Sequence, residues 1–315
     1  MARVLILGVN GQDGSYLAES LLKRGHTVFG VGRDSVSRHV PSAPGFHYRH
    51  CDLPDEARLT EVIAEAEPDQ AFHFAALHGA IADAFSYETQ WSGMMRVNVL
   101  ALHTLLEHAR LRAPQMHVVY GGSCKVFPAP LRGDIDERTT MKATCLYGIG
   151  KLAARDLLAH YRRAHGVATT NLILFNHDSA RRPAVFFLPI VARGLAAARL
   201  DRDHRFSVQT LDFMIDWSAA DELMELVADL GDRRELDEVI MASGTTLYAR
   251  EIVKRLFAEH GLDVLAHVHE RKPQSDPGPH FQVRIDRLEA AVGRRPTKTI
   301  FQIVDDILQS LAHAR

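Results

Sequence analysis

One stretch near the N-terminus decides the fold: Val4-Leu5-Ile6-Leu7-Gly8-Val9-Asn10-Gly11-Gln12-Asp13-Gly14. Its first four residues are all apolar, which is typical of a strand buried on both faces. The glycines then follow a GxxGxxG spacing, and residues 15–24 have the pattern of an amphipathic helix. Between a strand and a helix, such glycines let backbone amides approach a pyrophosphate, and the helix N-terminus adds partial positive charge. We therefore predict a phosphate-binding loop here; the alternative is a purely structural turn.

Apolar runs and amphipathic stretches alternate as far as residue 177, which predicts an α/β protein with a doubly wound parallel, Rossmann-like sheet. The predicted segments are strands at 4–7, 27–31, 46–51, 71–76, 116–120 and 169–175, and helices at 15–24, 59–66, 94–112 and 147–165. Ligand should bind beyond the carboxyl ends of these strands. We expect residues 1–177 to form the cofactor domain, with later segments contributing, and residues 178–315 to form a smaller, mainly substrate-binding domain.

The second half has a looser pattern, with short loops and no repeat. Here we predict helices at 188–198, 219–230, 249–260 and 303–312, a strand at 239–241, and a loop at 272–280 that contains three prolines.

The composition excludes several classes of protein. The 315 residues include 37 Lys and Arg against 39 Asp and Glu, so the chain lacks the excess of cations that a nucleic-acid binder needs. No apolar run approaches the roughly 18 residues that span a bilayer, and the first residues do not resemble a signal peptide. The three cysteines, Cys51, Cys124 and Cys145, fit neither a disulfide framework nor a zinc site. We expect a cytoplasmic protein with no membrane partner.

The end of the second strand selects the dinucleotide. NAD-binding sites carry an acid there for the ribose 2′-hydroxyl, whereas an Arg accommodates the 2′-phosphate of NADP. Here Gly32 is followed by Arg33, which favours NADP(H), although Asp34 would be the NAD-type acid if the strand ended one residue later. After the third strand, Asp52 is a candidate to accept from the adenine amino group; the alternative is that it caps a helix.

A second motif carries the chemistry. Tyr147 and Lys151 are spaced i and i+4, so they share one face of a helix. A neighbouring ammonium would lower the pKa of the phenol and make Tyr147 a usable acid–base, while Lys151 can also hold the nicotinamide ribose. Ser123, after the fifth strand, completes the set. The glycine loop, Ser123, Tyr147 and Lys151 in this order resemble the extended, nucleotide-sugar branch of the short-chain dehydrogenase/reductase superfamily.

The resemblance extends over nearly the whole chain and is closest to GDP-mannose 4,6-dehydratases. Residues 11–17 resemble that family's phosphate loop, and Leu174-Phe175-Asn176-His177-Asp178-Ser179-Ala180-Arg181-Arg182 is similar to its LFNHESPRR segment. Asp216-Trp217 and Asp221 follow its RDW pattern in part, and residues 242–246 with Arg250 follow a late strand-to-helix turn.

The resemblance implies two sets of binding residues. The cofactor would contact Gly8, Gly11, Gln12, Asp13, Gly14, Arg33, Asp52, Leu53, Ala75, Tyr147, Lys151, Asn176, His177 and Arg182. The substrate would contact His78, Asn176 and Arg181. The alternative for Arg181 and Arg182 is a solvated basic pair.

The chain departs from this family where the sugar should react. The family's Thr-Ser-Glu or Thr-Asp-Glu trio aligns with Ser123, Cys124 and Lys125, so Cys124 takes the place of the C6 proton donor and Lys125 that of the carboxylate that removes the C5 proton. The pattern's Arg becomes Ile215, and a late Arg-Pro contact to the diphosphate becomes Gln274-Ser275-Asp276-Pro277. Arg271 or Lys272 is the candidate to compensate.

Two further features leave alternatives open. Residues 123–128 also resemble the SSCIYP run of GDP-fucose synthases, in which Cys does acid–base work; otherwise Cys124 is a small buried thiol. The pairs His47 with His50 and His73 with His78 lack metal-site spacing, so we expect no metal and read His73 as a core or cofactor-wall residue. His78 and His103 are candidates to face the active site.

The sequence thus predicts an NADP(H)-dependent enzyme that transfers a hydride at C4 of a nucleotide-diphosphate sugar, with GDP the expected nucleotide. Reduction or epimerisation of a 4-keto sugar is favoured, because the C5 base is replaced. The alternatives are a GDP-mannose 4,6-dehydratase-type lyase and an inactive NADP-binding regulatory protein. By analogy with the family, we expect a homo-oligomer, a dimer or tetramer, formed through the helices at 94–112 and 147–165.

Overall fold

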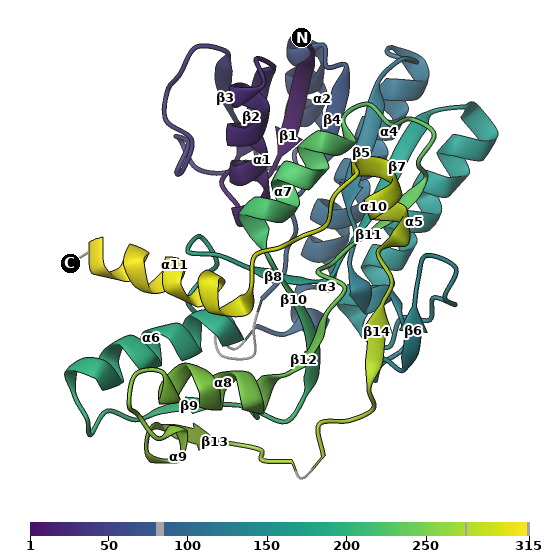
Figure 1. The fold of residues 1–315 in the computed structure, drawn as a ribbon. Coiled ribbons are helices and arrows are strands. Elements are labelled where there is room, and N and C mark those ends of the chain that lie inside the picture. Colours follow the sequence, from purple (N-terminus) through teal and green to yellow (C-terminus); the bar gives the residue numbers. More distant parts are fainter. Residues whose placement is uncertain (80–84, 275, 314–315) are drawn as a thin grey trace.

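The computed structural model describes residues 1–79, 85–274 and 276–313 (Figure 1). Seven parallel strands form the large sheet in the spatial order β11-β7-β5-β4-β1-β2-β3. They are β1 (Arg3–Leu7), β2 (Thr27–Gly32), β3 (Phe46–His50), β4 (Gln70–His73), β5 (His117–Gly121), β7 (Ala168–Leu174) and β11 (Glu238–Met241). The order reverses between β1 and β4, and such a switch point is where doubly wound sheets bind ligand.

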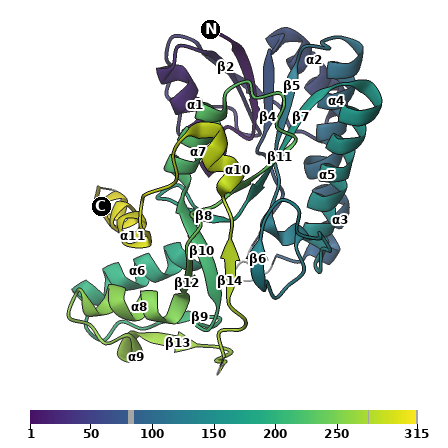
Figure 2. The ribbon, with the colours of Figure 1, turned by 45° about the vertical axis from the view of Figure 1, so that its right-hand side comes forward.

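Helices cover both faces of this sheet (Figure 2). Alternate residues of each strand point to opposite faces, so two separate apolar layers form: Val4 and Ile6 pack in one, Leu5 and Leu7 in the other. The first layer contains α1 (Gln12–Lys23), α7 (Ala220–Leu230) and α10 (Asp286–Val292); the second contains α2 (Glu56–Ala66), α4 (Ala101–Leu111) and α5 (Leu146–His165).

The helix predicted at 94–112 is longer and interrupted. α3 (Tyr87–Met95) leads into a π-helical turn (Arg96–Leu100) and then α4. The turn buries Asn98, whose carbonyl accepts from the Tyr120 hydroxyl at 3.0 Å and whose side-chain oxygen accepts from the Leu77 amide at 2.9 Å. The widened turn therefore connects the end of β4 with the middle of β5.

A second unit, formed mainly by segments after β7, lies below the large sheet in Figure 1. Its three-stranded sheet has the order β12-β10-β8, and two two-stranded pairs, β9–β13 and β6–β14, flank it. These strands are β6 (Gly133–Ile135), β8 (Asn176–Asp178), β9 (Phe206–Val208), β10 (Met214–Ala219), β12 (Thr246–Tyr248), β13 (Val268–Glu270) and β14 (Phe281–Val283). The helices of the unit are α6 (Phe187–Leu200), α8 (Ala249–Ala258), α9 (Val264–His267) and α11 (Ile300–His313).

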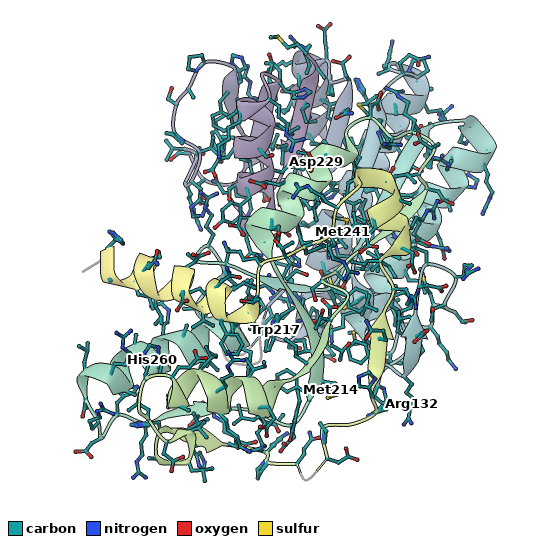
Figure 3. All side chains as sticks on the ribbon, viewed as in Figure 1. Arg132, Met214, Trp217, Asp229, Met241 and His260 are labelled. Carbon is teal, nitrogen blue, oxygen red and sulfur yellow. The ribbon has the colours of Figure 1, made fainter. Side chains whose placement is uncertain are left out.

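Trp217 on β10 lies between the large-sheet layers and the α6–α8 layer (Figure 3). Its ring is 5.8 Å from Phe187 and 6.2 Å from Phe213, and its indole N–H donates to Asp178 at 3.1 Å. Because Asp178 ends β8, this contact joins two neighbouring strands of the second unit's sheet.

The predicted α/β class and parallel sheet are confirmed. Differences are largest where tertiary contacts set the ends of elements: α1 begins at Gln12 rather than at 15, and β4 stops at His73 rather than at 76. The sequence predicted none of the strands of the second unit; all of them except β10 have three residues, which are too few to show alternation. The domain boundary after residue 177 stays a prediction; β11, α7 and α10 come from beyond it and pack with the large sheet.

Candidate active site

The predicted phosphate loop lies at the carboxyl end of β1 and opens α1. Gly8 has a φ of +91°, and a Cβ there would lie 2.6 Å from the Ala75 amide nitrogen. At Gly14 a Cβ would lie 2.4 Å from the Gly8 carbonyl oxygen. Neither position tolerates a side chain, so α1 starts tight against the sheet. Gly11 caps α1 without a side-chain hydrogen bond, which leaves the first-turn amides for an anionic ligand.

A buried ion pair joins this loop to the segment after β7. His177 Nε2 lies 2.9 Å from Asp13 Oδ1, and its Nδ1 lies 2.7 Å from the Phe175 carbonyl oxygen. Because both neighbours are acceptors, the geometry suits a doubly protonated imidazolium. Burial opposes both charges, but the attraction prevails: the pKa of Asp13 is lowered to about 2 and that of His177 is raised. Gln12 adds a contact by accepting from the Ser179 hydroxyl at 2.8 Å.

The two arginines predicted near phosphates are not a solvated pair. Arg181 donates to Ser15 at 3.0 Å and to Glu19 at 2.6 Å, so its guanidinium holds the 176–182 segment against α1. Arg182 lies 3.8 Å over the Phe186 ring, and its charge partly opposes the rise that burial causes in the pKa of Tyr147. Arg182 therefore lies nearer the reacting centre than Arg181. Asn176, in β8, has an exposed side chain.

After the end of β2, the Arg33 side chain is exposed, whereas the Asp34 carboxylate already has hydrogen-bond partners within the protein. The Asp34 carboxylate accepts from Asn10 at 2.8 Å and pairs with Arg38 at 2.8 Å, and the Tyr48 hydroxyl donates to the Asp34 carbonyl at 2.7 Å. These hydrogen bonds hold the pKa of Asp34 below its ordinary value. β2 ends at Gly32, as the sequence predicted.

The alternative for Asp52, a helix cap, is wrong. α2 begins at Glu56, and its cap is Asp55, whose carboxylate accepts from the Arg58 amide at 3.0 Å. Asp52 is exposed and Leu53 is buried. Asp52 thus remains a candidate to contact the adenine.

Ser123 and Tyr147 lie on adjoining elements. Ser123 caps a 3-10 turn (Cys124–Val126) after β5, and its hydroxyl accepts from the Lys125 amide at 3.2 Å. A Cβ on Gly148 would lie 2.2 Å from the Lys125 carbonyl oxygen, so only glycine lets the first turn of α5 pack on this turn. Cys145 caps α5 by accepting from the Gly148 amide at 3.4 Å.

Lys151 is buried, and none of the described carboxylates is hydrogen-bonded to it. Its ammonium donates to the Gly121 carbonyl at 2.5 Å and lies 4.4 Å over the Tyr120 ring and 5.6 Å from the Tyr147 ring centroid. Burial lowers the pKa of Lys151 to about 7. Burial also raises the pKa of Tyr147, with smaller effects from Tyr87 and Arg182. The lowered phenol pKa that the sequence predicted is not found, because desolvation outweighs the nearby cations.

The positions at which the chain departs from the family lie in different surroundings. Cys124 is buried in the core layer of α1 and α7, and burial raises its thiol pKa. Lys125 is exposed. At Ile215 the side chain packs into the apolar core of the second unit, so that position supplies no cation. Ser275 lies outside the described residues, while Arg271 and Lys272 are exposed beside β9 and β13.

The histidines follow the core interpretation where they are buried. His73 is fully buried, its Nε2 lies 3.0 Å from the Val97 carbonyl oxygen, and desolvation lowers its pKa to about 3. His47 stacks on Phe29 at 4.9 Å. His78 lies 4.5 Å from the Tyr147 ring and is exposed, which fits a substrate-facing position; His103 instead lies against Tyr161, 6.0 Å away. Within the described ranges, no three His, Cys, Asp or Glu side chains could together hold a metal.

Sequence reasoning missed two contributors. Tyr87 lies 5.8 Å from the Tyr147 ring, but the predicted helix began at 94. Asp216 was noted only as part of a pattern; its buried carboxylate accepts from the Ser243 amide at 2.8 Å and the Thr245 amide at 3.0 Å, so it holds the turn between β11 and β12.

A phosphate loop on a doubly wound sheet, with Ser, Tyr and Lys at β5 and α5, defines an extended short-chain dehydrogenase/reductase. The family model for GDP-mannose 4,6 dehydratase matches residues 5–295. The GDP-mannose 4,6 dehydratase of Homo sapiens is 30% identical over 291 residues, which cover 87% of this chain and 76% of that protein. The enzyme of that name from Yersinia enterocolitica is 27% identical over 280 residues, with 84% and 73% covered. The chain therefore belongs to the GDP-mannose 4,6-dehydratase family.

Solved structures agree on the fold. A dTDP-glucose 4,6-dehydratase from Bacillus anthracis, in complex with NAD, has a TM-score of 0.82 at 14% identity, covering 98% of this chain and 96% of that one. RMD from Pseudomonas aeruginosa, complexed with NADPH, has a TM-score of 0.79 at 20% identity, covering 99% and 100%.

Family membership makes this chain an enzyme that acts on a nucleotide sugar. No helix in the described part of the chain is both long and apolar enough to cross a membrane.

Proposed function

We propose that this protein is an NADP(H)-dependent enzyme that transfers a hydride at C4 of a GDP-sugar and acts as a 4-keto reductase or epimerase. The observation that carries the proposal is Lys125, exposed on the turn next to Ser123, where the family has the carboxylate that removes the C5 proton. A lysine side chain serves as a general base only where burial desolvates it, and Lys125 is exposed.

Three carboxylates that could be considered as a replacement base already have structural partners. Asp13 pairs with His177, Asp178 accepts from Trp217, and Asp216 accepts from two backbone amides. Recruiting any of them as the C5 base would break a structural contact. Cys124 is a poor replacement for the C6 proton donor in its buried setting, because burial raises its thiol pKa and it packs in the core.

The residues assigned to hydride transfer support the first half of the reaction. When bound, the nicotinamide would supply the hydride. Tyr147 would exchange the proton with the C4 oxygen, Ser123 would orient that oxygen, and Lys151 would hold the ribose. The first-turn amides of α1, with Gly8, Gly11 and Gly14, would bind the pyrophosphate. His177 and Gln12 hold this loop, and Arg182 and Asn176 would complete the wall near the nicotinamide.

We favour NADP over NAD because Asp34, the acid near the end of β2 that could bind the ribose of NAD, is already bound to other side chains. Asp34 would have to leave Arg38 and Asn10 to accept from a ribose hydroxyl. Arg33 and Arg38, both exposed, would instead meet a 2′-phosphate. Asp52, Leu53 and Ala75 would line the adenosine and ribose side.

The diphosphate of the substrate would rely on Arg271 or Lys272, since Ile215 offers no charge.

We further propose a homodimer through the π turn, α4 and α5, where Leu100 and Ile149 are 56% and 44% exposed. A cytoplasmic location is consistent with three free thiols, including the exposed Cys145.

The test is an assay of NADPH oxidation with GDP-4-keto-6-deoxymannose as substrate. Turnover that depends on both enzyme and sugar supports the proposal. Absence of turnover, combined with formation of that same keto sugar from GDP-mannose and NADP⁺, would assign the chain to 4,6-dehydration, the reaction that its family membership favours.

A further inference from the structure

A carboxylate lies in the turn of α1 that we assign to the pyrophosphate. Asp13 is the second residue of α1 and follows the Gly11 cap. The Ser15 amide donates to the Gly11 carbonyl at 3.1 Å and begins the helical bonding, whereas the amides of residues 12–14 precede it and have no acceptor within the helix. These amides suit an anion, but an ionised carboxylate beside them would repel it unless a second charge compensates.

The compensating charge comes from another part of the chain. His177 lies on β8, which pairs with β10 of the second unit, and its Nε2 is 2.9 Å from Asp13 Oδ1. Its Nδ1 is 2.7 Å from the Phe175 carbonyl oxygen. Because each ring nitrogen faces an acceptor, each carries a proton, and the imidazole is a cation. Asp13 and His177 together therefore have no net charge.

Burial strengthens this pairing and fixes it in place. The side chains of Asp13 and His177 are only 18% and 9% exposed, so water screens their charges little. The Gln12 side chain donates to the Asp13 carboxylate at 3.1 Å and to the His177 carbonyl at 3.3 Å, which ties the two residues together. Gly14 packs so closely against Gly8 that a Cβ would lie 2.4 Å from its carbonyl oxygen, so the backbone beside the pair is fixed as well.

Two other cations, Arg182 and Lys151, also attract the Asp13 carboxylate. Arg182 has a carboxylate of its own, because its Nε lies 3.4 Å from an oxygen of Asp178. Burial lowers the pKa of Lys151 to about 7, so it carries only part of a charge at neutral pH. Among the described residues, His177 is the cation that is hydrogen-bonded to Asp13. Loss of its charge would leave a buried carboxylate beside the amides of the first turn.

We propose that His177 is a positioning residue for the cofactor, which neutralises Asp13 so that the first turn of α1 accepts the negatively charged pyrophosphate. The inference rests on the proposed function and adds the second unit to the cofactor site. It gives the two partners opposite effects: His177 favours binding through its charge, and Asp13 opposes binding whenever that charge is lost. The resemblance places both residues at the cofactor without distinguishing their effects.

The experiment measures NADPH affinity by fluorescence titration. His177→Gln and His177→Asn keep a hydrogen-bond donor but lose the charge, so NADPH should bind roughly 10-fold or more weakly, the effect of one charge at close range. Adding Asp13→Asn to His177→Gln removes the repelling carboxylate, and the affinity should rise again toward that of the wild type. A purely structural contact predicts the reverse, because a second substitution in it cannot restore binding.

The matched control is Arg250→Gln, which takes the cation from another carboxylate of low exposure. Arg250 donates to Asp212 at 2.6 Å, and the Asp212 side chain is 3% exposed. Arg250 lies on α8, at the end of the second unit remote from α1 (Figure 1 and Figure 2), so NADPH affinity should not change. Thermal unfolding shows whether each variant is folded.

Unchanged NADPH affinity in a folded His177→Gln or His177→Asn protein overturns the inference alone. So does a folded double variant that binds NADPH no better than His177→Gln. Failure of the wild type to bind NADPH counts against the proposed function, and the inference falls with it.

Discussion

The residues that we assign to the cofactor and those that we assign to the sugar differ in how well they keep the features of the family. Among the residues assigned to the cofactor, Gly8 and Gly14 lie too close to neighbouring backbone for a side chain, Asp13 pairs with His177, and the buried Lys151 donates to the Gly121 carbonyl. On the sugar side, Lys125 is exposed and Ile215 is apolar where the resemblance implies a carboxylate and an arginine. In our proposal, hydride transfer and the later steps on the sugar therefore depend on different residues. The residues for the later steps can change while those for hydride transfer are kept.

Tyr147→Phe tests the cofactor side most severely. The variant keeps the ring contacts with His78 and Tyr87 but removes the transferable proton. Turnover should fall by roughly 10²- to 10⁴-fold, while NADPH binding persists. The measurement pairs steady-state NADPH oxidation with a fluorescence titration of NADPH. Unchanged turnover would show that another group donates the proton.

The β2 terminus gives a smaller effect. Wild-type protein should bind NADPH at least severalfold more tightly than NADH, because Arg33 and Arg38 would contact the 2′-phosphate that NADH lacks. Arg38→Ala removes a cation and also releases Asp34, so NADPH should weaken and NADH should strengthen. Asp34→Asn is the matched control and should leave NADH weak. Equal affinities in the wild type, with NADH binding lost in Asp34→Asn, would make Asp34 the NAD-type acid.

A further test concerns stability rather than activity. Lys151 has a pKa lowered to about 7 by burial, against 10.5 in the unfolded chain. Between these values the unfolded state binds the extra proton, so the folded state gains stability as the pH rises. Lys151→Met should therefore be the more stable protein at pH 7, and its advantage should shrink toward pH 10 by at most about 1.4 kcal/mol per pH unit. Urea unfolding across this range measures it. A pH-independent difference would mean that Lys151 is not desolvated.

The same contrast explains what the sequence could predict. The loop between β1 and α1 is local, so its spacing alone indicates strand, turn and helix. Contacts such as Asp13 with His177 join residues 164 positions apart, and no local pattern reports them. Tyr87 was missed because α3 buries only Met94 among its nine residues. Its sequence therefore shows little of the apolar periodicity that predicts a helix. The raised pKa of Tyr147 depends on burial by several elements, which a YxxxK spacing does not contain.

The most direct measurement follows the fate of GDP-mannose with NADP⁺, by mass spectrometry of the nucleotide sugar. The wild type should yield little or no 4-keto-6-deoxy product, because the exposed Lys125 stands in place of the carboxylate that removes the C5 proton in the family. Lys125→Glu should raise this product, and Lys125→Met, the uncharged control, should not. Robust dehydration by the wild type that is lost in Lys125→Met would make the lysine a genuine base and contradict the assignment of this chain to 4-keto sugar reduction or epimerisation.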